Sequence, residues 1–272
     1  MKNFAKRSNA RRSDCIRSVK ISFNTFGYAA GSVLFEMGNT KVLCSVNMNH
    51  GVPPFLKGKR VGWLTSEYAM LPSSTTSRSM RESSAVRRNG RSVEISRFIG
   101  RSLRTMVDFS LLGERTIVVD CDVLQADGST RTACITGASL ALRVAVDTWL
   151  RKKKLRENIL KDHIAAVSVG VVDEVPLLDL DFSEDSKADA DFNFVITRSN
   201  KLVEIQGASE GAIITWDQFD AAKTLSITGT RQLFDVCDSS FNQLMLANAP
   251  KKPDNIGKPL FSLGNRQNVS VR

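Results

Sequence analysis

The chain has 272 residues, of which 42% are apolar, enough to bury one large hydrophobic core. Its net charge is +10, from 38 Lys and Arg against 28 Asp and Glu, which favours a polyanionic partner: nucleic acid or an anionic membrane surface. Five scattered cysteines without a C-x-x-C pair argue against a disulfide framework or a zinc cluster, and no apolar run reaches the ~20 residues that span a bilayer.

The N-terminus is basic, because seven of the first twenty residues are Lys or Arg. Such a segment can be a transit peptide, but it has no amphipathic repeat, and no signal-type apolar region follows it. The scattered cysteines fit a reducing compartment. We therefore expect a cytoplasmic protein without membrane contact.

Short strands dominate the next part of the chain. Apolar runs predict strands at 19–23, 33–37 and 41–46, with a Gly-Asn-Thr turn at 38–40 between the last two. Consecutive strands joined by short turns pair antiparallel. The N-terminal third is therefore predicted to be an antiparallel sheet.

Helices and strands alternate in the middle of the chain. Residues 73–89, rich in Ser, Thr and Arg, predict an exposed loop or a loosely held helix. Apolar residues at three- and four-residue spacing predict an amphipathic helix over 93–108. A strand at 116–124 is then expected, followed by a long helix over 131–150 whose small residues allow close packing on a sheet.

The C-terminal third is predicted to return to strands before a final helix. The expected elements are strands at 164–172, 189–197 and 201–206 and a helix at 217–240. Later residues are rich in Pro, Lys, Asn and Gly, which is typical of disorder. We expect one domain over residues 1–240 and a basic, flexible tail over residues 241–272.

Two predicted helix starts are suited to anions. Residues 89–92 place Gly90 and Arg91 before one helix, and residues 127–131 place Gly128, Ser129, Thr130 and Arg131 before another. Unpaired amides, the positive end of the helix dipole and a guanidinium group together can hold a phosphate. The alternatives are ordinary capped helix starts, and neither segment is a Walker loop.

An acidic segment contrasts with the basic chain. Six carboxylates lie between residues 179 and 191, and strand alternation places Asp189 and Asp191 on one face, which Asp185 can join. Close like charges repel unless a cation neutralises them, and oxygen ligands favour Mg²⁺ or Mn²⁺ over zinc. A solvated acidic turn is the alternative.

Arginines are concentrated in one loop, whereas histidines are scarce. We expect four arginines to contact the backbone of RNA, a solvated loop being the alternative: Arg78, Arg81, Arg87 and Arg88. The two histidines, His50 and His163, have no serine or cysteine elbow nearby, so a hydrolase triad has little support. Phosphoryl transfer needs positioning and charge neutralisation more than a base, and it fits the residues present.

Several motifs together resemble the ribonuclease PH family. They are Gly-Trp-Leu-Thr-Ser-Glu-Tyr-Ala-Met-Leu-Pro at 62–72, the arginine-rich run at 90–104, Asp-Cys-Asp-Val-Leu-Gln-Ala-Asp-Gly-Ser-Thr-Arg-Thr at 120–132, Glu-Asp-Ser at 184–186 and Glu-Ile-Gln-Gly at 204–207. The similarity runs from about residue 7 to 238, in the family's order.

The resemblance implies an α+β fold with mixed sheets and a phosphorolytic 3′→5′ exoribonuclease that trims tRNA precursors and other RNAs and releases nucleoside diphosphates. It implies inorganic phosphate as co-substrate, Mg²⁺ or Mn²⁺ as the metal and a homo-hexamer built as a trimer of dimers. Arg91, Ser129, Thr130 and Arg131 would bind phosphate, and Asp185, Asp189 and Asp191 would hold the metal. The expected catalytic residues are Arg91, Arg131, Asp185 and Asp191.

The chain departs from the family pattern at two positions. Ser129 stands where the family usually has glycine, and its Cβ is expected to narrow the phosphate pocket or to demand a negative φ. Ser73 stands where the family tends to carry arginine, which removes one candidate contact to RNA or to a partner subunit. A catalytically silent RNA-binding subunit of an exosome-like ring and a hydrolytic nuclease are the alternative functions.

Overall fold

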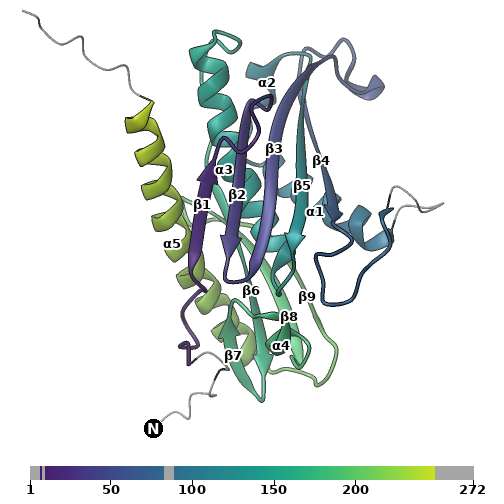
Figure 1. The fold of residues 1–272 in the computed structure, drawn as a ribbon, viewed down its shortest axis with the longest axis vertical. Helices are drawn as coiled ribbons and strands as arrows, with labels where there is room; N and C mark the ends of the chain where they lie inside the picture. Colours follow the sequence, from purple (N-terminus) through teal and green to yellow (C-terminus); the bar gives the residue numbers. More distant parts are fainter. Residues whose placement is uncertain (1–6, 8–9, 83–88, 249–272) are drawn as a thin grey trace, which may run out of the picture.

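The computed structural model describes residue 7, residues 10–82 and residues 89–248. Two sheets with helices packed on them form the fold (Figure 1). The larger sheet has the strand order β1 (Val19–Phe23), β2 (Gly31–Met37), β3 (Thr40–His50), β5 (Arg115–Gln125), β4 (Trp63–Met70). The smaller sheet has the order β7 (Val175–Leu178), β6 (Ile164–Val172), β8 (Ala190–Thr197), β9 (Leu202–Ser209).

Strand pairing is antiparallel throughout, except that β4 pairs with β5 in parallel. The strands predicted in the N-terminal third pair antiparallel as expected, whereas β4, which was not predicted, adds a parallel edge. A parallel neighbour needs a long crossover, and between β4 and β5 this crossover contains α1 (Gly90–Arg104) and the short α2 (Phe109–Leu112). The mixed-sheet α+β fold class expected from the sequence is confirmed.

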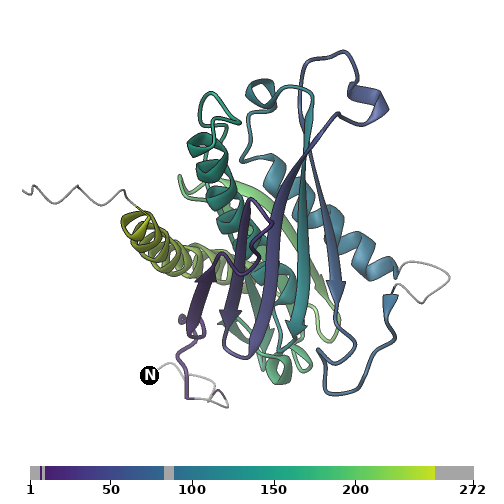
Figure 2. The same ribbon diagram turned by 45° about the horizontal axis from the view of Figure 1, so that its top comes forward.

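The long helix α3 (Thr130–Arg151) packs between the two sheets, against β2, β3 and β6. Figure 2 shows it behind the strands of the larger sheet, with α5 (Trp216–Ala247) along the side of the fold. A Cβ at Gly31 would lie 2.3 Å from the carbonyl oxygen of Ala141, so only glycine allows β2 to approach α3 this closely. Of the described helices, α3 alone is long and apolar enough to cross a membrane, and it is mostly buried between the sheets.

Helix boundaries differ from the predictions at several points. α1 begins at Gly90 rather than 93 and ends at Arg104, and α5 continues beyond residue 240 to Ala247. Five elements were not predicted: η1 (Pro54–Leu56), β4, α2, α4 (Phe182–Asp185) and β7. Most of the expected C-terminal tail, residues 249–272, lies outside the described residues.

Candidate active site

A cavity of about 310 Å³ opens between the ends of β4 and β5, the middle of β6, the first half of β8 and the helices α1, α3 and α4. A second cavity, of about 360 Å³, adjoins it. Four charged side chains line both: Arg91, Arg131, Asp185 and Asp191. The four expected catalytic residues, which come from three helices and one strand, therefore share one cleft.

Arg91 lies in the first turn of α1. The side chain of Asn89 caps this helix by accepting a hydrogen bond of 3.0 Å from the backbone N–H of Arg91. The Arg91 amide is thus already satisfied, and what this helix start offers the cavity is the guanidinium group. Among the described residues, no acidic side chain forms an ion pair with Arg91.

The start of α3 is different, because Ser129 makes no side-chain cap to the first turn. The amides of that turn remain open to a ligand, beside the side chains of Thr130 and Arg131. Arg131 is loosely held: its Nη1 lies 3.5 Å from Oε1 of Gln206 and 3.8 Å from Oε1 of Glu94.

Ser129 adopts the left-handed conformation, with φ of +56°. The expectation that its Cβ demands a negative φ is therefore wrong. The hydroxyl lies 2.5 Å from that of Ser168, and it lies within donating distance of Oδ1 of Asp179 (3.2 Å) and the carbonyl of Leu180 (3.1 Å). These hydrogen bonds offset the strain of a left-handed serine.

Gly128 packs directly on the acidic segment. A Cβ there would lie 2.4 Å from the carbonyl oxygen of Leu180, and φ of +74° also favours glycine. The loop 127–131, the expected phosphate loop, and the segment that leads to Asp185 are therefore in backbone contact.

Asp185 and Asp191 line the same cavity, and their carboxylates repel each other. The pKa of Asp185 is raised by desolvation and by the negative charge of Asp191, while Arg91 and Arg131 oppose this rise. Desolvation likewise raises the pKa of Asp191, against the charge of Arg131. Within the described part of the chain neither carboxylate is ion-paired, and the only side-chain hydrogen bond is a long one of 3.4 Å from Asn193 to Asp191.

Asp189 does not line either cavity. Its backbone N–H donates to the carbonyl of Val171, and its carbonyl accepts hydrogen bonds from the amides of Glu210 and Gly211, which holds the residue directly before β8. Across residues 10–82 and 89–248, no three His, Cys, Asp or Glu side chains gather as a metal cluster. The structure thus brings together two of the three expected metal ligands.

The remaining carboxylates of the acidic segment are structural. Asp179 is fully buried and accepts hydrogen bonds from the side chains of Arg17, at 2.7 and 3.0 Å, and Arg11, at 3.2 Å. Burial alone would raise the pKa of Asp179, but the arginine charges hold it below its usual value. Glu184 pairs with Arg7 at 2.5 Å, and Asp181 caps α4.

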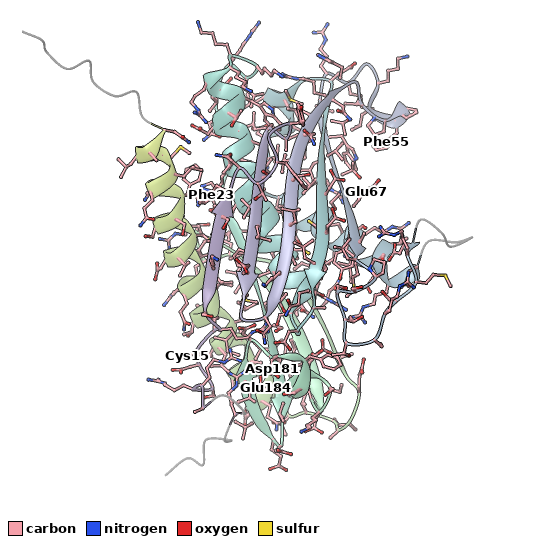
Figure 3. The ribbon with its side chains drawn as sticks, viewed as in Figure 1. Cys15, Phe23, Phe55, Glu67, Asp181 and Glu184 are labelled. Carbon is pink, nitrogen blue, oxygen red and sulfur yellow. The ribbon has the colours of Figure 1, made fainter. Side chains whose placement is uncertain are left out.

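The described residues of the basic N-terminal segment are accordingly part of the fold. Arg7 and Arg17 are only 5% and 6% exposed, and their partners lie at the base of α4. Figure 3 shows Cys15 of this segment at the same end of the molecule as Asp181 and Glu184.

The expected RNA-binding loop is only partly described. Arg78 and Arg81 are exposed, in a loop whose Thr75 and Thr76 line the cavity, and Ser73 is exposed in the same loop. Arg87 and Arg88 lie outside the described residues.

Several residues of the cavity were not predicted as site residues, among them Ser168, Phe182 and Asn193. Ser168 on β6 and Asn193 on β8 are direct partners across the sheet. The polar positions Asp191 and Asn193 alternate along β8, which was a usable signal for Asn193. Phe182 had no signal, because the helix that presents it was not predicted.

The fold and the cavity define an α+β enzyme that handles an anionic substrate beside a pair of open carboxylates. Comparison with known families agrees. Domain 1 of the 3′ exoribonuclease family matches residues 15–146, and domain 2 of that family matches residues 162–229. The chain therefore belongs to the 3′ exoribonuclease family.

Curated relatives carry the name ribonuclease PH. The protein from Neisseria meningitidis serogroup B is 51% identical over 224 residues, which cover 82% of this chain and 93% of that protein. One from Neisseria gonorrhoeae is 50% identical over the same length. These matches confirm the expected family and, at the level of the family, the expectation of a phosphorolytic 3′→5′ exoribonuclease.

Solved structures share the fold at lower identity. Rrp46 of rice (Oryza sativa) superposes with a TM-score of 0.70 at 16% identity, over 86% of this chain and 99% of that one. A chain of the Archaeoglobus fulgidus exosome, solved with RNA bound to the active site, gives 0.70 at 24% identity, over 84% and 91%. At these identities the likeness shows the fold alone.

Proposed function

We propose that this protein shortens single-stranded RNA from its 3′ end, tRNA precursors included, by transferring each terminal nucleotide to inorganic phosphate. One observation carries the proposal: two arginines and an uncapped helix start share a cavity with two carboxylates that lack ion-pair partners in the described structure. The arginines and the helix start are suited to an anion, and the two carboxylates are suited to a cation.

Inorganic phosphate would bind at the start of α3. The open amides of the first turn and the Thr130 hydroxyl donate hydrogen bonds, and Arg131 adds charge. Arg91 reaches the same cavity from α1 and is suited to a second phosphate oxygen or to the scissile phosphodiester. Tyr68 donates a hydrogen bond of 3.3 Å to the Thr130 hydroxyl and thereby orients it.

Asp185 and Asp191 would hold a divalent cation, Mg²⁺ or Mn²⁺. The residues fit such an ion: both are hard oxygen donors, they raise each other's electrostatic energy when empty, and water and phosphate oxygens can complete the shell. When bound, the cation neutralises charge on the transferring phosphoryl group and on the leaving oxygen. Asp189, which lines neither cavity, would lie beside this pair rather than coordinate the cation.

The reaction needs no strong base in the protein. An oxygen of hydrogen phosphate attacks the terminal phosphodiester in line, and the bond from phosphorus to the 3′ oxygen of the penultimate nucleotide breaks. The proton carried by hydrogen phosphate ends on that 3′ oxygen, so the products are a shortened RNA with a 3′ hydroxyl and a nucleoside diphosphate. Arg91 and Arg131 hold the reacting groups together in a low-dielectric site.

Arg78, Arg81, Arg87 and Arg88 would hold the RNA backbone, with little dependence on sequence. We further propose a cytoplasmic homo-hexamer, a trimer of dimers. The catalytic domain would extend to the end of α5 at Ala247 rather than to residue 240, with the basic tail after it. The resemblance to the ribonuclease PH family supports this assembly.

Product analysis tests the function. The purified protein is incubated with a 3′-tailed RNA and Mg²⁺, with and without phosphate. Nucleoside diphosphates that appear only with phosphate are the expected result. Nucleoside monophosphates would identify a hydrolase instead, and intact RNA would identify a silent subunit.

A further inference from the structure

The 310 Å³ cavity has apolar as well as charged walls. Met70 at the end of β4, Ala126 after β5 and Phe182 at the start of α4 line it together with the phosphate loop. The Phe182 side chain is 59% exposed, although most phenylalanines of the core are fully buried. An aromatic ring left open at the wall of a polar cavity calls for a ligand with an apolar face.

The position of Phe182 is set by its backbone rather than by packing of the ring. Asp181 and Glu184 form a capping box that fixes α4, and the amide of Phe182 donates a hydrogen bond of 3.2 Å to Oδ1 of Asp127 in the phosphate loop. Asp185 follows three residues later, on the same face of this helical turn. The ring is thus held at a constant distance from the phosphate loop and from one open carboxylate.

Phosphate and a divalent cation do not use an apolar wall, because both are hydrophilic on every side. A cavity of about 310 Å³ is at the lower end of the range that holds a small organic ligand, so it has room for more than these two ions. The part of the proposed substrate with an apolar face is the nucleobase. Stacking of a base on an aromatic ring is the usual way in which proteins hold single-stranded nucleic acid without reading its sequence.

We propose that Phe182 stacks on the base of the 3′-terminal nucleotide, and that Met70 and Ala126 complete this base subsite. The proposal rests on the proposed function, since it assigns a place within the same cavity to the nucleotide that is transferred. The flexible thioether of Met70 adapts to bases of different size, so all four are accepted. Purines stack over a larger area than pyrimidines and are therefore bound more tightly.

Binding measurements with reaction products can distinguish the contribution of the base from that of the phosphates. Dissociation constants for ADP, UDP and inorganic diphosphate are measured by calorimetry with Mg²⁺, on the wild type and on Phe182→Ala, Phe182→Tyr and Phe55→Ala. Phe55 is the matched control, because it is also 59% exposed and lies at the opposite end of the molecule from Asp181 and Glu184 (Figure 3).

Phe182→Ala is expected to weaken ADP about tenfold, to weaken UDP less, and to leave inorganic diphosphate unchanged. Phe182→Tyr retains the wild-type affinities, and Phe55→Ala changes none of them. Equal weakening of ADP and inorganic diphosphate, or unchanged ADP affinity in Phe182→Ala, would overturn the proposal. So would a wild type that binds inorganic diphosphate as tightly as ADP.

These outcomes are independent of turnover. A wild type that releases no nucleoside diphosphates from RNA would refute the proposed function, whereas the base subsite is judged by the difference between ADP and inorganic diphosphate. In an active enzyme, Phe182→Ala also raises KM for RNA about tenfold while KM for phosphate stays constant, a split that general loss of structure does not produce.

Discussion

The acidic segment contains two groups of carboxylates in opposite electrostatic environments. Asp179 and Glu184 are buried against Arg7, Arg11 and Arg17, with short ion pairs. Asp185 and Asp191 lie in the cavity without an ion pair in the described part of the chain, and their pKa values are raised, whereas that of Asp179 is lowered.

The contrast separates stability from function within one stretch of sequence. The paired carboxylates join the N-terminal segment to the base of α4, and this holds Asp185 in place. The open carboxylates repel each other and cost stability until a cation arrives. Within a cluster of charged residues, those with an ion-pair partner in the protein can therefore be assigned a structural role, and those without one are candidates for ligand binding.

Neutralising an open carboxylate should have the largest effect on catalysis. We expect Asp191→Asn to lower the rate of phosphorolysis on the order of 10²-fold or more, because a metal ligand is lost, while the melting temperature stays the same or rises as repulsion is relieved. Rates and thermal unfolding are measured together. Asp189→Asn is the matched control. An equal loss of activity in this variant would contradict the assignment of Asp185 and Asp191, without Asp189, as the metal ligands.

Neutralising a paired carboxylate should instead affect the fold. Asp179→Asn removes the nearer counter-charge of the buried Arg17 and leaves only Asp127 at 3.9 Å, so the free energy of unfolding is expected to fall by about 3–5 kcal/mol. Urea denaturation measures the change. Asp14→Asn, which breaks an exposed ion pair with Arg12 in the same segment, should change stability little. Comparable losses in the two variants would contradict the structural role of Asp179.

Lowering the pH should protonate the two groups of carboxylates in different pH ranges. Cation binding requires ionised Asp185 and Asp191, so Mn²⁺ affinity falls as the pH drops through their raised pKa values, while protonation of these two groups stabilises the metal-free fold. The contribution of Asp179 is present above its unfolded pKa and is lost only at lower pH, through its depressed folded pKa. Mn²⁺ titrations and circular dichroism should therefore show a pH range with a folded protein that binds no metal; simultaneous loss of both would contradict the comparison.

The smallest effect is expected in the arginine loop. The double variant Arg78→Gln, Arg81→Gln should weaken RNA binding severalfold and reduce its salt slope by about 0.7 for each RNA phosphate that the loop no longer neutralises. Fluorescence anisotropy at several salt concentrations measures this. Lys57→Gln with Lys59→Gln, which removes the same charge from an exposed loop beside η1, serves as control. An equal reduction there would show that net charge alone matters.

Local patterns predicted much of this fold. Strands β1 and β6 are found at the predicted residues, since each is a short apolar run between clear turns. Pairing over long distances was harder: the parallel pairing of β4 with β5 depends on the crossover through α1. The capping box of α4 was missed because four residues are too few to show periodicity.

The residues of the candidate site could be predicted where the side-chain chemistry and the family motif indicated the same positions. Arg91, Arg131, Asp185 and Asp191 were named from the sequence and the family resemblance, and they share the cavity. The structural carboxylates could not be sorted from the open ones, because Arg17 lies 162 residues from Asp179. The left-handed Ser129 was also unexpected, since its hydrogen bonds to Ser168 and Asp179 arise from distant segments.

Transfer of radiolabelled inorganic phosphate tests most directly whether the cavity unites phosphate with the RNA end. With unlabelled RNA and Mg²⁺, the wild type should place the label in the β-phosphate of the released nucleoside diphosphates. Arg131→Ala should reduce this labelling by about 10²-fold or more and still retain RNA. Unlabelled monophosphate products from the wild type, or full labelling by Arg131→Ala, would contradict the account.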